Sequence, residues 1–420
     1  MTVHADPTEE QIAQSRALFF EGIGHFEGGR LERARICFEK CEALTPGRSS
    51  VLGNLGITLF QLRRWEAAIP VLRQATTADP SLAEAWACLG LASEAQGQWQ
   101  AAAEALERAL ALSPQQVRLW LSLGQVSLRV GNAENALRAF DRALREDPGC
   151  APAWSERGNL MRELHRFEEA ARCFEEALVL GGDPELNGFY LASVRDGDAL
   201  TAAPRRYVEA LFDDYAADFQ SHLVERLGYR GFEVLLKPLL ETGKRYGQVL
   251  DLGCGTGLCG PLIAPQADVI DGVDVSAAML EQARKLGAYR ELIHADLGAF
   301  LATTALRPDL VLAADVFVYV GDLATVFGSV RRILAPGGCL AFTVELAREG
   351  HDIQLLPSLR YAIPKPMSAV WPMSPGSPAC AFPRRRYGTT RPRRSWACTS
   401  TWNESDGGAV SSGMWHEKCV

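Results

Sequence analysis

The feature that most limits how this chain can fold is a 34-residue period in its first half. Pro46, Pro80, Pro114 and Pro148 stand 34 residues apart. Such a period predicts stacked repeats, because one short helical pair cannot bury its own apolar face and must pack against its neighbours. Three more columns keep the same register: glycine (Gly22, Gly56, Gly90, Gly124, Gly158), alanine (Ala34, Ala68, Ala102, Ala136, Ala170) and a bulky apolar residue (Phe38, Leu72, Leu106, Phe140, Phe174).

The spacing inside each unit predicts two antiparallel helices. Apolar residues recur at helical intervals, and the glycine and alanine columns would let the two helices approach closely. The proline column would end the second helix, because proline lacks the backbone N–H and clashes with the preceding turn. This pattern resembles the tetratricopeptide repeat, in five units over residues 15–184, with residues 1–14 as a leader.

The resemblance implies a solenoid that binds another molecule. Such repeats usually hold a protein or peptide on their concave face, so we expect an unidentified protein or peptide partner; spacing or dimerisation of the chain is the alternative. Trp86, Trp120 and Trp154 share a column and could form an aromatic binding stripe. Packing inside the repeat explains these tryptophans better.

The second half of the chain has a different rhythm. At 420 residues the chain is too long for one ordinary core, so two or more domains are expected. A stretch rich in glycine and aspartate predicts a linker over residues 185–204, and a helical pattern resumes over residues 205–240. Beyond residue 240, short apolar runs alternate with helical ones, which predicts βαβ units around a parallel sheet.

The stretch VLDLGCGTGLCG, residues 249–260, lies where the first predicted strand turns into a helix. Its alternating glycines remove side chains where the backbone must bend sharply and approach a ligand. Ligands of parallel sheets bind at the carboxyl ends of the strands. The dinucleotide fingerprint G-x-G-x-x-G would need glycine where this chain has Leu258.

The G-x-G-x-G spacing, two residues after an acid, resembles the nucleotide loop of class I S-adenosylmethionine-dependent methyltransferases. Acidic residues also stand at the ends of the following predicted strands, and a P-G-G turn precedes the fifth predicted strand. The resemblance covers about residues 205–350 and implies a methyltransferase domain over residues 205–362. The fold class we expect is therefore α plus α/β, an all-α solenoid followed by a Rossmann-like parallel sheet.

The same resemblance implies a cofactor site for S-adenosylmethionine, with S-adenosylhomocysteine as the product. Asp274 would accept hydrogen bonds from the ribose hydroxyls, and Asp296 would contact the adenine amino group. The full set of implied residues is Asp251, Gly253, Cys254, Gly255, Gly257, Asp274, Val275, Met279, Asp296, Leu297, Ala314 and Asp315.

The helix expected over residues 205–240 resembles the lid of predicted methyltransferases that carry tetratricopeptide repeats. There, Tyr215 and Phe219 would cover the cofactor, although both could instead be interdomain core. Candidates for a base at the mouth of the site are His222, Tyr319 and Asp315, and His222 could equally be a surface histidine. We expect no metal, because the histidines are dispersed and no H-E-x-x-H appears.

The composition limits the partners and the compartment. Lysine and arginine total 43 against 51 acids, a net charge of −8, which argues against nucleic acid as the main partner. No apolar run reaches membrane-spanning length, and the N-terminus lacks the pattern of a signal peptide. The cysteines are scattered without a C-x-x-C pair, so we expect a reduced, cytoplasmic location.

The character of the sequence changes at Ile363. We predict an irregular, basic and proline-rich tail over residues 363–420, where the methyltransferase family has a helix and two more strands. The fifth strand would then expose an unpaired edge. One choice of synonymous codons, read one nucleotide earlier from Ala362, encodes a helical phrase typical of the family, which motivates a frameshift hypothesis. A native disordered tail or a partner-binding extension is the alternative.

Two functions follow from these patterns. The first is an S-adenosylmethionine-dependent methyltransferase that acts on an unidentified acceptor and uses its repeats for protein–protein interaction. The second is a non-catalytic repeat scaffold whose methyltransferase-like domain binds the nucleoside without turnover.

Overall fold

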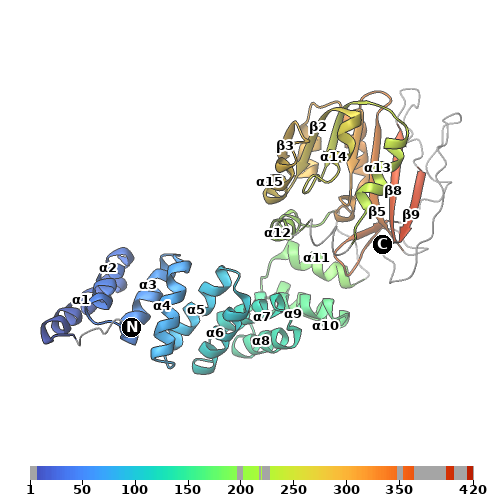
Figure 1. Ribbon diagram of the computed structural model, residues 1–420. Coiled ribbons are helices and arrows are strands. Elements are labelled where there is room, and N and C mark those ends of the chain that lie inside the picture. Colours follow the sequence, from blue (N-terminus) through green and yellow to red (C-terminus); the bar gives the residue numbers. More distant parts are fainter. Residues whose placement is uncertain are drawn as a thin grey trace. The chain divides into compact units, whose positions relative to one another are not determined.

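The computed structural model describes residues 7–195, 202–216, 219, 228–347, 353–363, 394–401 and 414–419. It divides into two compact units, Met1–Asn187 and Gly188–Val420. Figure 1 shows helices in the first unit and a sheet with helices in the second. This arrangement confirms the fold class that the sequence predicts.

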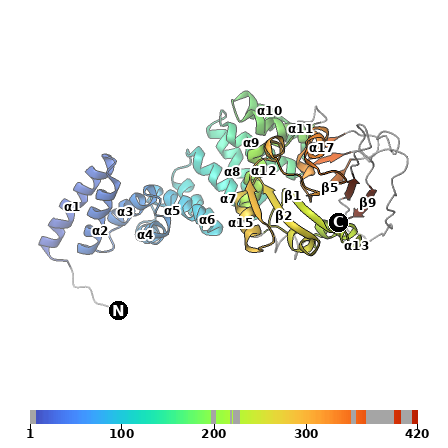
Figure 2. The ribbon, with the colours of Figure 1, turned by 90° about the horizontal axis from the view of Figure 1, so that it is seen from above.

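The first unit is a solenoid of helical pairs, visible from a second direction in Figure 2. Each pair corresponds to one 34-residue unit of the sequence. The helices are α1 (Glu9–Glu27), α2 (Leu31–Leu44), α3 (Ser49–Gln61), α4 (Trp65–Ala78), α5 (Ala83–Ala95), α6 (Trp99–Leu112), α7 (Val117–Arg129), α8 (Ala133–Glu146), α9 (Ala151–Glu163) and α10 (Phe167–Val179).

The repeats need glycine in the glycine column because a bulky side chain of the paired helix fills the space that a side chain at that position would occupy. A Cβ atom added at Gly158 would lie 2.6 Å from the Phe174 ring, and one added at Gly22 would lie 2.7 Å from Phe38. Ala170, in the alanine column, is fully buried. The repeat pattern is therefore a packing pattern between the two helices of each unit.

The aligned tryptophans also hold the repeat together. The indole Nε1 atoms of Trp86, Trp120 and Trp154 each donate a hydrogen bond to the carbonyl of the proline six residues earlier, at 3.0, 2.7 and 3.0 Å. These bonds tie each first helix to the turn before it. The structure thus gives the tryptophan column a role inside the repeat.

Helix α11 (Pro184–Val194) lies where we predicted a linker. The Phe189 ring is fully buried, and its centroid lies 5.3 Å from that of Tyr207 and 6.5 Å from that of Tyr361. These aromatic contacts pack the C-terminal part of α11 into the second unit. Aromatic packing therefore makes this stretch helical despite its glycine and aspartate.

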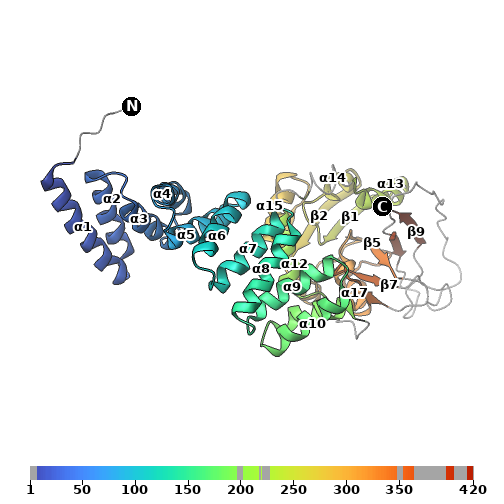
Figure 3. The same ribbon diagram turned by 90° about the horizontal axis from the view of Figure 1, so that it is seen from below.

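The second unit is built on one sheet with the strand order β3-β2-β1-β4-β5-β7-β6. Strands β1 to β5 are mutually parallel, and Figure 3 shows β1 and β2 side by side. The order reverses at β1, so ligands are expected beyond the carboxyl ends of β1 and β4. The strands are β1 (Tyr246–Leu252), β2 (Ala267–Asp274), β3 (Glu291–His294), β4 (Leu310–Ala313), β5 (Cys339–Leu346), β6 (Gln354–Leu355) and β7 (Tyr361–Ile363).

Helices cover both faces of the sheet. Helices α13 (Gly231–Glu241) and α14 (Gly260–Ile263) pack on the face that carries Val249, whereas α16 (Leu297–Thr303) and α17 (Leu323–Ile333) pack on the face of Leu250. Helix α15 (Ala277–Lys285) follows β2. Alternation along β1 puts the Asp251 side chain on the Val249 face.

The predicted lid helix over residues 205–240 is wrong as a single helix. The structure describes α12 (Arg205–Tyr215) and α13, separated by non-helical residues 228–230. Gly228 has a φ of 63°, a left-handed conformation that ends a helical path. Helix α13 belongs to the core under the sheet, so α12 and Phe219 remain from the predicted lid among the described residues.

The prediction of a tail without strands is also wrong for its described residues. Strand β8 (Arg394–Thr401) pairs antiparallel with β5, and β9 (Met414–Cys419) pairs with β8. The fifth strand therefore does not expose the unpaired edge that we expected. Backbone pairing explains this difference, since the ladder does not depend on an apolar period in the side chains.

Candidate functional site

A cavity of about 600 Å³ lies beyond the carboxyl ends of β1, β2 and β4, a volume within the usual range of ligand pockets. Residues far apart in the sequence meet there because parallel strands end at the same edge. The predicted site residues that line it are Asp251, Gly253, Cys254, Gly255, Asp274, Val275, Met279, Asp296, Leu297, Ala314, Asp315, Phe219 and Tyr319.

The glycine loop presents bare backbone to this cavity. Gly253 and Gly255 have φ values of 63° and 53°, which side-chain-bearing residues rarely adopt. A Cβ added at Gly255 would meet nothing within 4 Å, so a side chain there would project into open space. At Gly253, by contrast, an added Cβ would clash with the Val316 side chain, so the open part of the cradle that the loop forms is at Gly255.

Gly257 is the predicted loop residue that does not line the cavity. Its φ is 86°, and its N–H donates to the Cys254 carbonyl at 2.9 Å, which closes the turn. An added Cβ would lie 3.0 Å from the Tyr289 ring. This glycine is needed for the path of the loop.

Asp274 ties the loop to the start of α15. Its Oδ2 accepts the Gly255 N–H at 2.8 Å, and its Oδ1 accepts the Ser276 N–H at 2.9 Å. The carboxylate is buried, and burial raises its pKa while these backbone donors lower it. Each oxygen keeps a second lone pair that can accept a hydroxyl donor from a ligand.

Helix α12 is fastened over this region by a second carboxylate. Asp213 accepts a hydrogen bond from the Ser276 hydroxyl at 2.5 Å. On the same helix, Glu209 lies 3.8 Å from His294 Nε2, at the end of β3. Phe212 on α12 lines the cavity and makes an edge contact with Phe219.

Asp251 is a buried acid beneath the loop. Its carboxylate accepts a hydrogen bond from the Tyr289 hydroxyl at 2.7 Å, and the residue is 1% exposed. Burial raises the pKa of Asp251 to about 7, the Tyr289 hydrogen bond opposes that rise, and Asp274 adds to it. This acid can therefore change its charge near neutral pH.

Asp315 carries backbone strain at the end of β4. Its φ is 59°, a left-handed value for a residue with a side chain. Its N–H donates to the buried Thr343 hydroxyl at 2.7 Å, which fixes that conformation. Strain of this kind gathers at functional sites.

Two predicted residues cannot be placed at the cavity. The backbone of Tyr215 ends α12, and its side chain lies outside the described part of the structure. His222 lies outside the described residues altogether. Both therefore remain predictions.

Other lining residues escaped the sequence analysis. Arg360 and Tyr229 line the cavity but come from a short turn and a loop without a motif. Phe212 also lines it and lies in the segment that resembles a lid, but it was not singled out there. Tyr289 was missed because its role appears only in the hydrogen bond to Asp251. The resemblance to a lid marked this segment as a whole and did not distinguish Phe212 within it.

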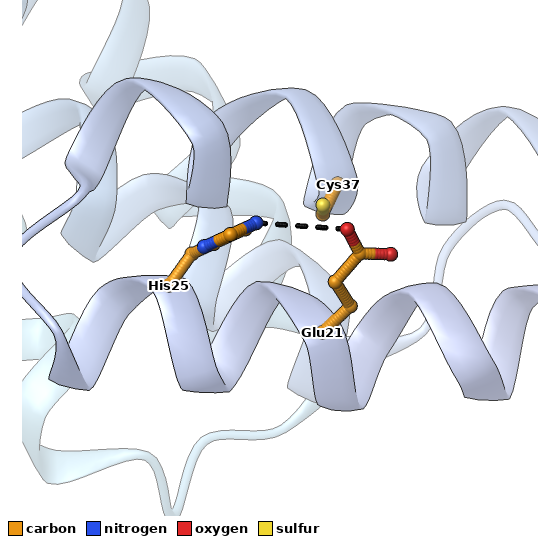
Figure 4. Close-up of side chains that lie close together, drawn as sticks. All are labelled: Glu21, His25 and Cys37. Atoms are coloured by element: carbon orange, nitrogen blue, oxygen red, sulfur yellow. Dashed lines mark ion pairs between the residues drawn. The ribbon is translucent and has the colours of Figure 1, made fainter.

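One cluster of possible metal ligands lies in the first unit. Figure 4 shows Glu21, His25 and Cys37, whose ligand atoms lie within 4.8 Å of one another. The histidine Nδ1 accepts a hydrogen bond from Arg30 at 2.8 Å, so its proton is on Nε2, which faces Glu21 at 3.6 Å. When a histidine binds a metal through one ring nitrogen, the other nitrogen normally carries a proton and donates it to an acceptor. Here the nitrogen that faces Glu21 carries the proton, and the other accepts from Arg30. This cluster therefore does not fit a metal.

Comparisons with known families agree with this architecture. A family model described as a methyltransferase domain matches residues 250–340. A model described as a tetratricopeptide repeat matches residues 54–117, 89–151 and 121–187. Among the described residues, no helix combines the length and apolarity that crossing a membrane would require.

A Streptomyces aklanonic acid methyltransferase is 31% identical over 165 residues, which are 36% of this chain and 72% of that protein. The chain belongs to the class I methyltransferases. The chain also carries the tetratricopeptide repeats that its sequence period predicts.

A malonyl-(acyl-carrier protein) O-methyltransferase of Legionella pneumophila is 36% identical over 145 residues, which are 32% of the chain and 49% of that protein. The match thus spans about half the length of that relative. A solved structure titled "Crystal structure of MamA" is 27% identical in sequence and has a TM-score of 0.36. The match covers 38% of this chain and 94% of the chain in that structure.

Proposed function

We propose that this chain transfers a methyl group from S-adenosylmethionine to an acceptor that binds in the cavity of the second unit. The observation that carries the proposal is the meeting of the glycine cradle, Asp274 and Asp296 in one cavity. Gly253 and Gly255 would hold the donor against bare backbone, and Asp274 would accept its ribose hydroxyls. Asp296, which caps α16 through a 2.9 Å hydrogen bond from Ala299, would lie at the adenine.

The residues of the chain would contribute positioning and exclusion of water. When bound, S-adenosylmethionine supplies an electrophilic methyl group. Phe212 of α12 and Phe219, whose rings contact each other, would cover it. Holding two reactants in line in a dry site accounts for much of the acceleration of such displacements. Asp315 and Tyr319 line the same cavity, where either would hold the reacting group of the acceptor in place.

The test is transfer of a labelled methyl group from S-adenosylmethionine to fractionated cell extract by the full chain. The proposal predicts a labelled product and release of S-adenosylhomocysteine. Binding of S-adenosylhomocysteine without any product would favour the non-catalytic scaffold. Failure to bind either nucleoside would reject both.

For the solenoid, we propose recruitment of a protein or peptide partner. Its repeat fold supports this. The indole N–H groups of the tryptophan column already donate to the repeat's own carbonyls, so other side chains would supply the hydrogen bonds to a ligand. Crosslinking mass spectrometry on the full chain in extract tests the proposal. Partner crosslinks should gather on the first helices of the repeats, α3, α5, α7 and α9, and an even spread over all helices would contradict it.

A further inference from the structure

One side of the cavity carries a partly buried cation. Arg360 lines the cavity beside β7, and its side chain is 27% exposed. Its guanidinium lies 5.8 Å from the ring centroid of Tyr319 and 4.0 Å from an oxygen of Asp315. Burial lowers its pKa, but Tyr319, Asp315 and Glu345 outweigh burial and raise it. Arg360 therefore stays charged inside the cavity.

The other cation that lines the cavity, among the described residues, differs in its surroundings. Arg205 is 54% exposed and lies 3.6 Å from Glu209 on the same helix. Solvent screens an exposed charge of this kind strongly, whereas it screens the partly buried guanidinium of Arg360 less. A ligand inside the cavity would therefore meet Arg360 as its main positive charge.

A second polar group in the same wall is the buried Tyr229 hydroxyl. It lies next to Asp315 but makes no hydrogen bond of standard geometry to any described residue. Burial raises the pKa of Tyr229, Asp315 raises it further, and Arg360 lowers it, so all three side chains interact electrostatically. A buried hydroxyl without a good hydrogen bond costs folding free energy, and a hydrogen bond to an oxygen of a bound ligand would remove that cost.

We infer from this arrangement that the methyl acceptor carries a carboxylate, which Arg360 binds with the Tyr229 hydroxyl as a further donor. The inference rests on the proposed function. A guanidinium forms two parallel hydrogen bonds to a carboxylate. Its five N–H donors allow it to keep Asp315 and Tyr319 while it does so.

The charges elsewhere in the cavity narrow the position of such a carboxylate. Asp251 and Asp274 would repel an anion from the glycine loop, and Asp296 would repel it from the adenine end. Asp315 lies on the Arg360 wall, but it is already paired with that guanidinium at 4.0 Å, so this wall is the position left for a carboxylate. The acids that line the cavity are Asp251, Asp274, Asp296, Asp315 and Asp322.

The experiment uses the full chain saturated with S-adenosylhomocysteine. Acetate, malonate and glutarate are titrated against it by calorimetry, with acetamide, malonamide and glutaramide as neutral partners of the same shape. The carboxylates should bind at least about tenfold more tightly than the amides. Equal binding of the two series would overturn the inference, and so would a preference for ethylenediamine, which would point to Asp315 as the contact for a cationic acceptor.

Three variants locate the contact. Arg360→Gln should abolish the preference for carboxylates, and Arg360→Lys should keep only part of it, because lysine retains the charge but not the paired donors. Arg245→Gln, an exposed arginine that pairs with Asp268 outside the cavity, is the matched control and should keep the preference. Unchanged carboxylate binding in both Arg360 variants would refute the assignment. If Arg360→Gln does not fold, the lysine variant decides.

Affinity for S-adenosylhomocysteine separates this inference from the proposed function. Wild-type protein that fails to bind it would sink both. If the wild type binds but Arg360→Gln and Arg360→Lys do not, Arg360 holds the donor's own carboxylate. That result would overturn the inference and leave the proposed function standing.

Discussion

Replacing Asp251 with asparagine should stabilise the second unit at alkaline pH. Burial raises the pKa of this acid from an ordinary 3.8 to about 7. Because the folded-state pKa is raised, folding is most favoured below the unfolded pKa, and that stability is lost as pH rises from about 4 to about 7. At 1.36 kcal/mol per pKa unit, the ionised carboxylate costs about 4 kcal/mol at pH 8.

The Asp251→Asn variant removes that cost and keeps an oxygen that can accept the Tyr289 hydroxyl. Its advantage over the wild type should grow by about 2 to 3 kcal/mol between pH 5 and pH 8. The assay is scanning calorimetry of the full chain at both pH values. Asp268→Asn, at an exposed acid on β2, is the matched control and should show no such trend.

An equal stability difference between Asp251→Asn and wild type at both pH values would refute the reasoning. It would mean that Asp251 ionises as readily in the folded chain as in the unfolded one. The burial and the single phenol donor described for this side chain would then not control its charge.

Two further substitutions test the packing and the hydrogen bonds. Gly158→Ala should destabilise the solenoid by about 2 kcal/mol, because its methyl group would overlap the facing aromatic ring. The control is Gly188→Ala, in open space on α11, which should be about 1 kcal/mol more stable than wild type. Equal melting temperatures of the two variants would contradict this reasoning. Tyr289→Phe removes the donor to Asp251 and the acceptor of the Gly260 N–H, so thermal unfolding should show a loss of about 2 kcal/mol, and an unchanged melting temperature would count against it.

Much of the solenoid could be predicted from the sequence, because each repeat constrains itself locally. The 34-residue columns report contacts between helices that are neighbours in the chain, such as Gly158 against Phe174. Helix α11 was missed, since its glycine and aspartate predict a loop and its helix depends on distant aromatic partners, including Tyr361. Tertiary packing overrode local preference there.

The loop side of the candidate site could be predicted because its residues follow strands at regular places. Asp251, Asp274 and Asp296 each stand at a strand end, and parallel topology brings strand ends together. The opposite wall could not be predicted in this way. Arg360 and Tyr229 come from irregular segments, and only the folded chain puts them in one cavity.

Binding of S-adenosylhomocysteine to the full chain, measured by calorimetry, tests the central claim most directly. The account predicts saturable binding by the wild type and a loss of about a hundredfold in Asp274→Ala, because two hydrogen bonds to a carboxylate would disappear. Asp268→Ala should bind as the wild type does. An Asp274→Ala variant that folds and binds with unchanged affinity would contradict the account.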